Sequence, residues 1–328
     1  MREFNDYDIK FPELVYDIVN YFRASNGYKE QRAKSVWDYC LYSRFSKTKE
    51  NNGELIQPDV VHLICENLTK KRVINCIKVG MKVAGMDANY LYQPKNEAFF
   101  LSKAEGLLFY LNCIAYGFPY IYASYKDYVL PVIVKDNNED IAMGTCFRFS
   151  TGILTAKHCI DAKEVSIMGY TAERLKQGAV LVSNDPDLDL AYIELQEPNR
   201  FIPGEANVLD EVLVMGYPKI PMFHSFCTAE RAAISSIPTR GAVASLADQY
   251  ITRKAGPLML VTARIRGGNS GGPIINSSGA VVGVAFSEPT AEGNYDDMGY
   301  GVAYPIDLLG KLLDNCTNMQ VKFVDRVQ

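Results

Sequence analysis

The sequence predicts an α+β chain of two domains, a helical module over residues 1–124 followed by a β-rich domain over residues 125–328. In the first part, apolar residues recur at helical spacing, as in Phe11–Phe22. In the second part, Asp187–Leu195 alternates polar and apolar residues, which is typical of a half-buried strand. A chain of 328 residues that is 48% hydrophobic can also bury enough apolar surface for two domains.

The first module is expected to be compact and mainly helical. Helical patterns cover residues 11–22, about 28–46, 58–68, 71–84 and 103–116. Gly27 is a plausible stop for the first helix, and Pro58 fits the first turn of another, where its missing N–H costs nothing. Glu97–Leu101 is strand-like. The aromatic content of the module is too high for a solvated, disordered arm.

The end of this module resembles the wing-to-helix junction of winged-helix domains, in the segment Leu101–Leu107. That resemblance implies that Lys70–Arg72 and Lys78 could contact a phosphate backbone. Charges in the module are close to balanced, however, which disfavours strong binding to nucleic acid. We therefore expect a regulatory or partner-recognition role, since tethering gives a high effective concentration.

In the β-rich domain, the most informative segment is Gly268-Asn269-Ser270-Gly271-Gly272-Pro273. A serine that attacks a carbonyl must be exposed on a tight bend, near N–H groups that can stabilise negative charge. Glycines on both sides of Ser270 permit such a bend. On its own this pattern is weak, because many similar runs are plain turns.

A histidine and an aspartate stand where the serine would need them. His158 follows the strand-like Gly152-Ile153-Leu154, inside Thr155-Ala156-Lys157-His158-Cys159, and it is one of three histidines in the chain. Asp189 is expected at the start of a strand. The order His158, Asp189, Ser270 is that of the chymotrypsin-type proteases, and other serine hydrolases use different orders.

Residues from about 128 to 313 resemble the trypsin-like serine proteases, most closely their HtrA/Deg-like bacterial branch. The likeness rests on segments spread along the domain: Gly144–Phe147, Ile153–His158, Asp189–Ala191, Val212–Pro218, Arg240–Ser245 and Gly299–Ile306. The resemblance implies a chymotrypsin-like double six-stranded antiparallel β-barrel that ends in a short helix over residues 305–313. It also implies a serine endopeptidase without a PDZ domain.

The resemblance assigns a role to each member of the site. Ser270 is the nucleophile, His158 the general base and then acid, and Asp189 the residue that orients the imidazole. Gly268, Asn269 and Ser270 would form the oxyanion hole. Asp187 is the rival orienter, because it would share a strand face with Asp189.

The specificity pocket is expected near Arg264, six residues before the nucleophile, with Gly301 as a wall. A buried arginine would suit an acidic side chain. The alternative is that Arg264 points to solvent and the pocket accepts small apolar residues. Asn269 precedes the nucleophile where digestive-type enzymes have aspartate, so no activation by N-terminal cleavage of that kind is expected.

Composition indicates a cytoplasmic enzyme. No cofactor or metal is expected, because hydrolysis by the triad needs only water and the sequence shows no metal-binding cluster. The net charge of −4 gives no reason to expect a polyanion partner, and the charged first residues resemble no secretory signal. No stretch of about 20 apolar residues predicts a membrane span. The eight cysteines lack metal-ligand spacing and are expected to be free thiols, although Cys146 and Cys159 could lie close together.

Three functions remain open from the sequence. The first is an endopeptidase that acts on protein or peptide substrates and is controlled through residues 1–124. The second is a catalytically silent scaffold that binds peptides, and the third is a protease tethered to nucleic acid. Many HtrA-like enzymes are trimers, but the resemblance alone does not assign an oligomeric state here.

Overall fold

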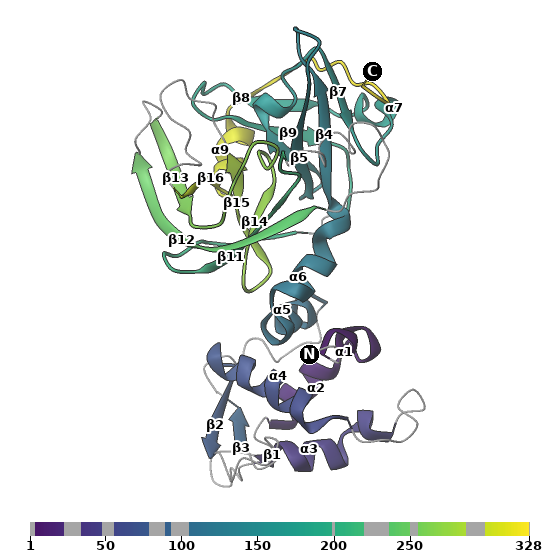
Figure 1. The fold of residues 1–328 in the computed structure, drawn as a ribbon, viewed down its shortest axis with the longest axis vertical. Helices are drawn as coiled ribbons and strands as arrows, with labels where there is room; N and C mark the ends of the chain where they lie inside the picture. The colour runs from purple at the N-terminus through teal and green to yellow at the C-terminus, as the bar shows by residue number, and fades with distance from the viewer. Residues whose placement is uncertain are drawn as a thin grey trace. The chain divides into compact units, whose positions relative to one another are not determined.

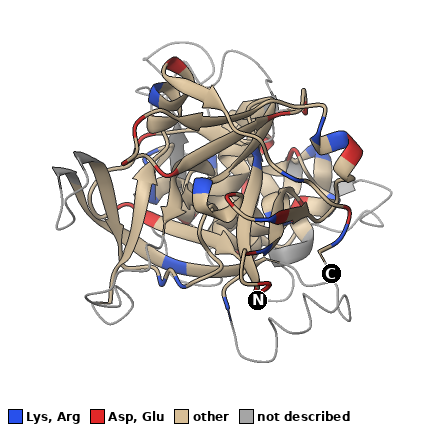
Figure 2. Cartoon of the chain, turned by 90° about the horizontal axis from the view of Figure 1, so that it is seen from above, with Lys and Arg blue, Asp and Glu red and all other residues tan. Residues whose placement is uncertain are grey.

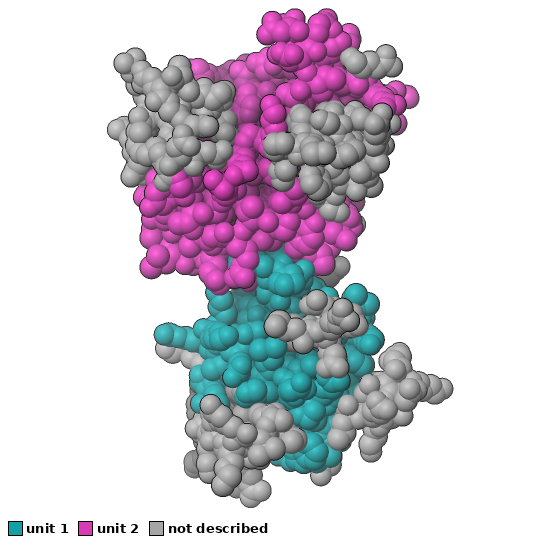
Figure 3. Space-filling view, in the orientation of Figure 1, with its two compact units in different colours: residues 1–121 teal, residues 122–328 magenta. Residues whose placement is uncertain are grey.

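A computed structural model describes residues 4–22, 34–47, 56–78, 89–92, 105–198, 201–219, 236–249, 255–286 and 299–327. The chain divides into two compact units, residues 1–121 and 122–328, and each is described by itself (Figures 1 and 3). The division falls inside helix α6 (Phe118–Tyr125), which is followed by a 3₁₀ turn, η4 (Lys126–Tyr128).

The first unit combines helices with a small sheet. Its elements are α1 (Phe4–Lys10), α2 (Leu14–Phe22), β1 (Lys34–Ser35), α3 (Val36–Tyr42), the 3₁₀ turn η1 (Arg44–Lys47), α4 (Pro58–Lys70), β2 (Ile74–Lys78), β3 (Asn89–Tyr92) and α5 (Glu105–Tyr116). The strands form one antiparallel sheet in the order β1-β3-β2.

Local sequence explains where these helices begin. Ser35 caps α3, because its hydroxyl accepts the N–H of Asp38 at 3.0 Å. Pro58 begins α4, as expected. The buried face of α2 consists of five apolar residues at helical spacing: Leu14, Val15, Ile18, Val19 and Phe22.

The helix expected over residues 71–84 is wrong, because residues 74–78 form the strand β2. The chain leaves α4 at Arg72, which has a φ of +57°, a conformation that ends a helix. Val73, Ile74 and Ile77 then favour a strand through their β-branched side chains. The strand-like segment Glu97–Leu101 lies outside the described residues, as does most of the segment that resembles a winged-helix junction.

The second unit contains two barrel-like sheets whose strand pairs are antiparallel, apart from the parallel pair β10–β15. This confirms the predicted α+β class with a chymotrypsin-like double barrel. The first seven-stranded sheet has the order β17-β8-β9-β6-β5-β4-β7. Its strands are β4 (Val129–Lys135), β5 (Ile141–Phe149), β6 (Gly152–Ala156), β7 (Glu164–Ile167), β8 (Val180–Ser183), β9 (Leu190–Glu194) and β17 (Cys316–Asn318). Short helical pieces lie between them: η5 (Lys157–Cys159) and α7 (Ala172–Leu175).

The second seven-stranded sheet has the order β10-β15-β14-β11-β12-β13-β16, and β15 also pairs with β16. Its strands are β10 (Ile202–Pro203), β11 (Glu211–Gly216), β12 (Ile237–Gln249), β13 (Ala255–Val261), β14 (Pro273–Asn276), β15 (Ala280–Phe286) and β16 (Gly301–Pro305). Each sheet therefore has the six strands expected of a barrel and one extra strand, β17 in the first and β10 in the second. Helix α9 (Leu308–Asp314) matches the predicted short helix.

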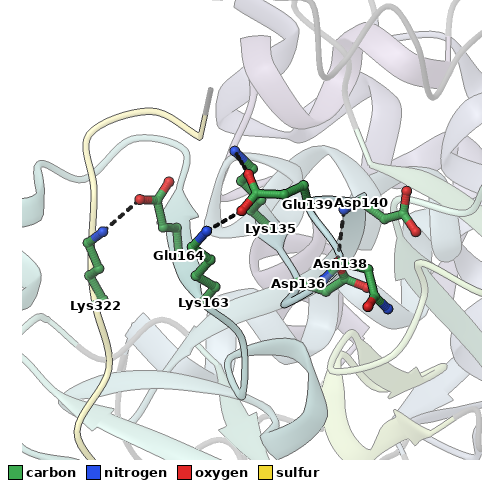
Figure 4. Close-up of polar contacts among 8 residues, drawn as sticks. All are labelled: Lys135, Asp136, Asn138, Glu139, Asp140, Lys163, Glu164 and Lys322. Carbon is green, nitrogen blue, oxygen red and sulfur yellow. Dashed lines mark hydrogen bonds and ion pairs between the residues drawn. The ribbon is translucent and has the colours of Figure 1, made fainter.

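The C-terminal segment returns to the first barrel, which the sequence analysis did not predict. Strand β17 pairs with β8, and a few residues later the N–H of Val324 bonds to the carbonyl of Val165 in β7 at 2.9 Å. The segment therefore joins the two edge strands of the first sheet (Figure 1). A salt bridge of 2.7 Å between Lys322 and Glu164 lies on its surface, close to the exposed Lys135–Glu139–Lys163 group (Figure 4).

Candidate active site

Ser270 lies in a tight turn that leads into β14. The two glycines of this turn have backbone angles that suit glycine, since Gly268 has a φ of +97° and Gly271 a φ of +84°. A side chain could not replace Gly271, because its Cβ would lie 2.2 Å from the carbonyl oxygen of Thr145. The N–H of Thr145 in turn donates to the carbonyl of Ser270 at 2.9 Å. The turn is thus fixed against β5 of the first barrel.

Carbonyl groups in the turn point away from Ser270, toward partners that hold them. Gly267 accepts the N–H of Lys219 at 2.6 Å, and Gly268 accepts the hydroxyl of Thr145, also at 2.6 Å. In a trans peptide the N–H points opposite to the carbonyl, so the N–H of Gly268 faces away from Lys219. Among the described residues, neither Gly268 nor Ser270 donates its N–H to a main-chain carbonyl.

Asn269 differs from its two neighbours in the expected oxyanion hole. Its N–H donates to the carbonyl of Arg266 at 2.9 Å, so it is engaged within the turn. The side chain is buried, and its Oδ1 has no hydrogen-bond partner among the described residues. Of the three residues predicted for the oxyanion hole, Gly268 and Ser270 are therefore the ones with N–H groups that a substrate could use.

His158 and Asp189 meet because their strands are paired. His158 lies in η5 directly after β6, Asp189 directly precedes β9, and Ala156 of β6 pairs with Leu190 of β9. The main-chain N–H of His158 donates to Oδ1 of Asp189 at 2.9 Å, and Nδ1 of the ring contacts Oδ2. The carboxylate therefore holds both the backbone and the ring of the histidine, which fixes the tautomer with its proton on Nδ1.

The carboxylate also changes the charge of the ring. Burial opposes protonation, but the hydrogen bond to Asp189, with contributions from Cys159, raises the pKa of His158 above its ordinary value of about 6.5. The side chain of His158 is 40% exposed, so solvent screens part of this interaction. The hydrogen bond to Asp189 thus favours the imidazolium more than in an isolated histidine.

The main chain of the rival orienter, Asp187, is hydrogen-bonded within its own loop and to Tyr304. Its N–H donates to the side chain of Asp185 at 3.0 Å, and its carbonyl accepts the hydroxyl of Tyr304 at 3.1 Å. The structure thus brings Asp189 to His158 and leaves Asp187 in the preceding loop.

The nucleophile segment contacts the base segment through Cys159. The thiol of Cys159, directly after His158, donates to the carbonyl of Ser270 at 3.4 Å. No hydrogen bond joins the hydroxyl of Ser270 to His158 in the described structure. Such bonds are often long in unliganded serine hydrolases and tighten when substrate binds.

Of the two alternatives left open for Arg264, the structure has the exposed one. Burial alternates from Val261 to Ile265, as it does along a strand, so Ala263 and Ile265 face inward while Arg264 is exposed. Gly301 lies against the buried Ile265, because a Cβ on Gly301 would be 2.6 Å from its Cγ1 atom. The side chain that packs against Gly301 is therefore the apolar Ile265, which fits the alternative of an apolar pocket that the sequence left open.

Two residues with contacts at the site had no predicted role. Thr145 was quoted for the resemblance, yet its hydroxyl holds Gly268 and also accepts the N–H of Tyr217 at 3.0 Å. Tyr304 contacts the loop that carries the acid. Neither had a signal in the sequence, because both contacts join segments more than 70 residues apart.

All the described cysteines are free thiols: Cys40, Cys65, Cys76, Cys113, Cys146, Cys159 and Cys316. Both Cys146 and Cys159 are buried. Burial raises the pKa of the Cys146 thiol, and the nearby Cys159 raises it further. Within the described ranges, no group of three or more His, Cys, Asp or Glu residues is arranged to hold a metal ion. No described helix has the length and apolar character needed to span a membrane.

Comparisons with known proteins find similarity to serine proteases. Residues 144–284 match the family model of the trypsin-like peptidase domain. The serine endoprotease DegS of Haemophilus influenzae is 24% identical over 252 residues, which cover 74% of this chain and 70% of DegS. A probable periplasmic DegP-like serine endoprotease of Marinomonas sp. is 30% identical over 49% of this chain, but the match spans only 32% of that protein.

Two solved structures are similar at lower identity. The HtrA-type protease AlgW with tripeptide is 20% identical, with a TM-score of 0.44 over 59% of this chain and 61% of AlgW. The active form of the Rv3671c protease from M. tuberculosis is 19% identical, with a TM-score of 0.46 over 61% of this chain and 86% of that protein.

Proposed function

We propose, on the premise that its second unit is a trypsin-like serine peptidase domain of the HtrA type, that this chain hydrolyses peptide bonds through Ser270, His158 and Asp189. His158 takes the proton of the Ser270 hydroxyl while the oxygen attacks the substrate carbonyl. The imidazolium then gives that proton to the leaving amine, which produces an acyl-enzyme and a free amine. Water repeats the cycle on the ester and releases the acid product.

The observation that carries this proposal is that the carboxylate of Asp189 contacts His158 twice, at its main-chain N–H and at Nδ1 of its ring. A carboxylate that bonds to Nδ1 leaves Nε2 as the basic nitrogen, and it stabilises the imidazolium that forms in the transition state. The N–H groups of Gly268 and Ser270 would stabilise the oxyanion, with individual donors worth roughly 3–4 kcal/mol in such sites.

The test compares two serine variants on an unstructured protein substrate. Ser270→Ala should reduce turnover by about 10⁶-fold, because the nucleophile and its base act as a unit. Ser278→Ala is the matched control, since this serine lies in the turn between β14 and β15 and takes no part in the site. Equal activity of Ser270→Ala and wild type would reject the proposed nucleophile. Complete inactivity of a folded wild-type chain would favour the silent, peptide-binding scaffold.

The primary pocket is proposed to accept small apolar side chains. The proposal is supported by Ile265, which follows Arg264 and packs against Gly301, while Arg264 itself is exposed. An apolar pocket discriminates between side chains by their size, with each methylene worth about 1–3 kcal/mol. A peptide series that differs only at the residue before the cut should therefore favour Ala or Val over Asp.

The first unit is proposed to recognise a protein partner or to regulate the protease. Its helices and the strand order β1-β3-β2 are compatible with the winged-helix resemblance seen in the sequence. The exposed side chains of α4 are Asp59, Leu63, Glu66 and Lys70, and the exposed Lys71 and Arg72 follow directly after the helix. Acidic and basic groups are therefore mixed there, which disfavours strong binding to a nucleic-acid phosphate backbone. Over the chain as a whole, Lys and Arg are interspersed with Asp and Glu (Figure 2). A protein partner therefore fits better than nucleic acid.

A truncated chain tests this role. The cut should come before α6, because the hydroxyl of Tyr122 bonds to Ser236 and that of Tyr125 to Gly279, so both belong to the second unit. Regulation predicts that a chain starting at residue 118 differs from the full chain in turnover or in captured partners. Unchanged turnover and partners would remove the regulatory role, and salt-dependent DNA binding by the full chain alone would favour the nucleic-acid tether.

A cytoplasmic location remains a proposal, supported by the free thiols of the described cysteines. Several DegP-like relatives are named as periplasmic, so cell fractionation is the deciding measurement. Recovery of the protein in the periplasmic fraction would contradict the proposal. The oligomeric state is open to direct measurement by light scattering.

A further inference from the structure

Tyr304 reaches from the second barrel to the loop of the first barrel that carries the acid. It lies in β16 and is 3% exposed. Its hydroxyl donates to the carbonyl of Asp187 at 3.1 Å and accepts the N–H of Asp189 at 3.4 Å. One hydroxyl group therefore fixes the backbone on both sides of Leu188, immediately before the residue that holds His158.

Other bonds to Asp189 come from the base segment itself. The N–H of Lys157 donates to the carbonyl of Asp189 at 3.1 Å, and the N–H of His158 donates to its side chain. These bonds fix the acid relative to the base. They do not fix either residue relative to Ser270, which lies at the start of the second sheet.

Tyr304 connects the acid and the base to the sheet that carries Ser270. Strand β16 pairs with β15, and β15 pairs with β14, the strand that directly follows the nucleophile turn. The ring of Tyr304 also packs on Phe286, with 4.8 Å between ring centroids, and Phe286 faces the imidazole of His158 at 6.3 Å. The hydroxyl and the ring thus connect the sheet of the nucleophile to both the acid and the base.

We propose that Tyr304 is a positioning residue that holds Asp189, and through it His158, in register with Ser270. This inference rests on the proposed protease function and adds a residue to its machinery. The contacts described for Tyr304 are with the loop that carries Asp189 and with Phe286, so it would act through Asp189. Losing its hydroxyl should therefore slow the chemical step, which depends on alignment, and leave substrate binding unchanged.

Tyr304→Phe tests the proposal, because it removes the hydroxyl and keeps the ring against Phe286. Tyr125→Phe is the matched control: Tyr125 is also buried in the second unit, and its hydroxyl also donates to one main-chain carbonyl, that of Gly279 at 2.8 Å. We expect kcat of Tyr304→Phe to fall about tenfold with KM within about twofold of wild type. Tyr125→Phe should keep the wild-type kcat.

A second readout separates positioning from general destabilisation. The titratable groups that act on His158 are Asp189 and Cys159, and Asp189 raises the pKa of the ring. A less closely held Asp189 should lower the pKa of His158, measured by NMR titration of the full chain, which has only three histidines to assign. Tyr125→Phe should leave that pKa in place.

The outcomes separate this inference from the proposed function. An active wild type, with Tyr304→Phe unchanged in kcat and in the pKa of His158, would overturn the positioning role and leave the protease function intact. Equal losses of kcat in Tyr304→Phe and Tyr125→Phe would also overturn it. A wild type without activity would reject the protease function, and the pKa of His158 would still report whether Tyr304 holds the acid.

Discussion

At the scale of single residues, the chemistry depends on the protonation state of His158. Only the neutral imidazole can accept the proton of Ser270, and the hydrogen bond to Asp189 raises the pKa of the ring. Below that pKa the base is already charged, so kcat/KM should increase with pH through a midpoint above the ordinary value of about 6.5. A pH–rate profile with a peptide substrate measures this midpoint, and a value at or below 6.5 would contradict the assigned hydrogen bond.

The two neighbouring aspartates give a matched pair of variants. Asp189→Asn should lower kcat roughly 10³–10⁴-fold, because an amide no longer stabilises the imidazolium and favours the wrong tautomer. Asp187→Asn should stay within about tenfold of wild type, since the side chain that bonds to His158 is that of Asp189. Steady-state kinetics of the two variants decide which aspartate orients His158. A larger loss of kcat in Asp187→Asn than in Asp189→Asn would reverse the assignment.

Residues of the site differed in how far the sequence predicted them. The local sequence patterns around His158, Asp189 and Ser270 predict their catalytic roles. The structure brings the first two of these residues together. The orientation of Arg264 was left open, because its position in the chain does not reveal the alternation that turns it outward. Tyr304 was missed, since a tyrosine in an apolar strand is an ordinary core residue until its long-range contact is known.

At the scale of elements, the nucleophile turn depends on glycine. Gly271→Ala should destabilise the fold by about 2–4 kcal/mol and abolish activity, because of its positive φ and the 2.2 Å approach to Thr145. Gly310→Ala is the control: it lies in α9, where an added Cβ would meet no atom within 4 Å, so it should stabilise by about 0.5–1 kcal/mol. Urea denaturation measures both, and a Gly271→Ala variant as stable as wild type would contradict the packed turn.

Most expected helices of the first unit were found, because caps and apolar periodicity are local signals. The segment after α4 was misread for a physical reason. Residues 71–78 are few, and both a helix and a strand can bury Val73 and Ile74, so the choice depends on β3, a partner that the local pattern cannot show.

At the scale of the whole second unit, the C-terminal segment closes the first barrel through an apolar contact. Phe323 is 3% exposed within the core of that barrel and pairs with Val165. Phe323→Ala should destabilise the unit by roughly 3–5 kcal/mol. Lys322→Ala removes only an exposed ion pair with Glu164 and should leave stability near wild type. Thermal unfolding measures the stability of both variants. Equal losses of stability in Phe323→Ala and Lys322→Ala would show that the segment is not part of the core.

This closure could not be predicted from the sequence. The barrel pattern and its order of motifs indicated twelve strands in two barrels, and those strands are present. The pairing of β17 with β8 joins residues more than 130 positions apart, and no periodicity in a short, polar segment indicates such a partner. Local patterns identify strands, but the register and closure of a sheet are long-range properties.

The central claim is that Ser270 is a nucleophile activated by His158, and covalent labelling tests it most directly. The full chain would be treated with a fluorophosphonate, and the modified residue identified by peptide mass spectrometry. We predict a single adduct on Ser270 that forms faster as pH rises through the pKa of His158 and is lost in His158→Ala. A folded chain that gives no adduct, or an adduct on another residue, would contradict the account.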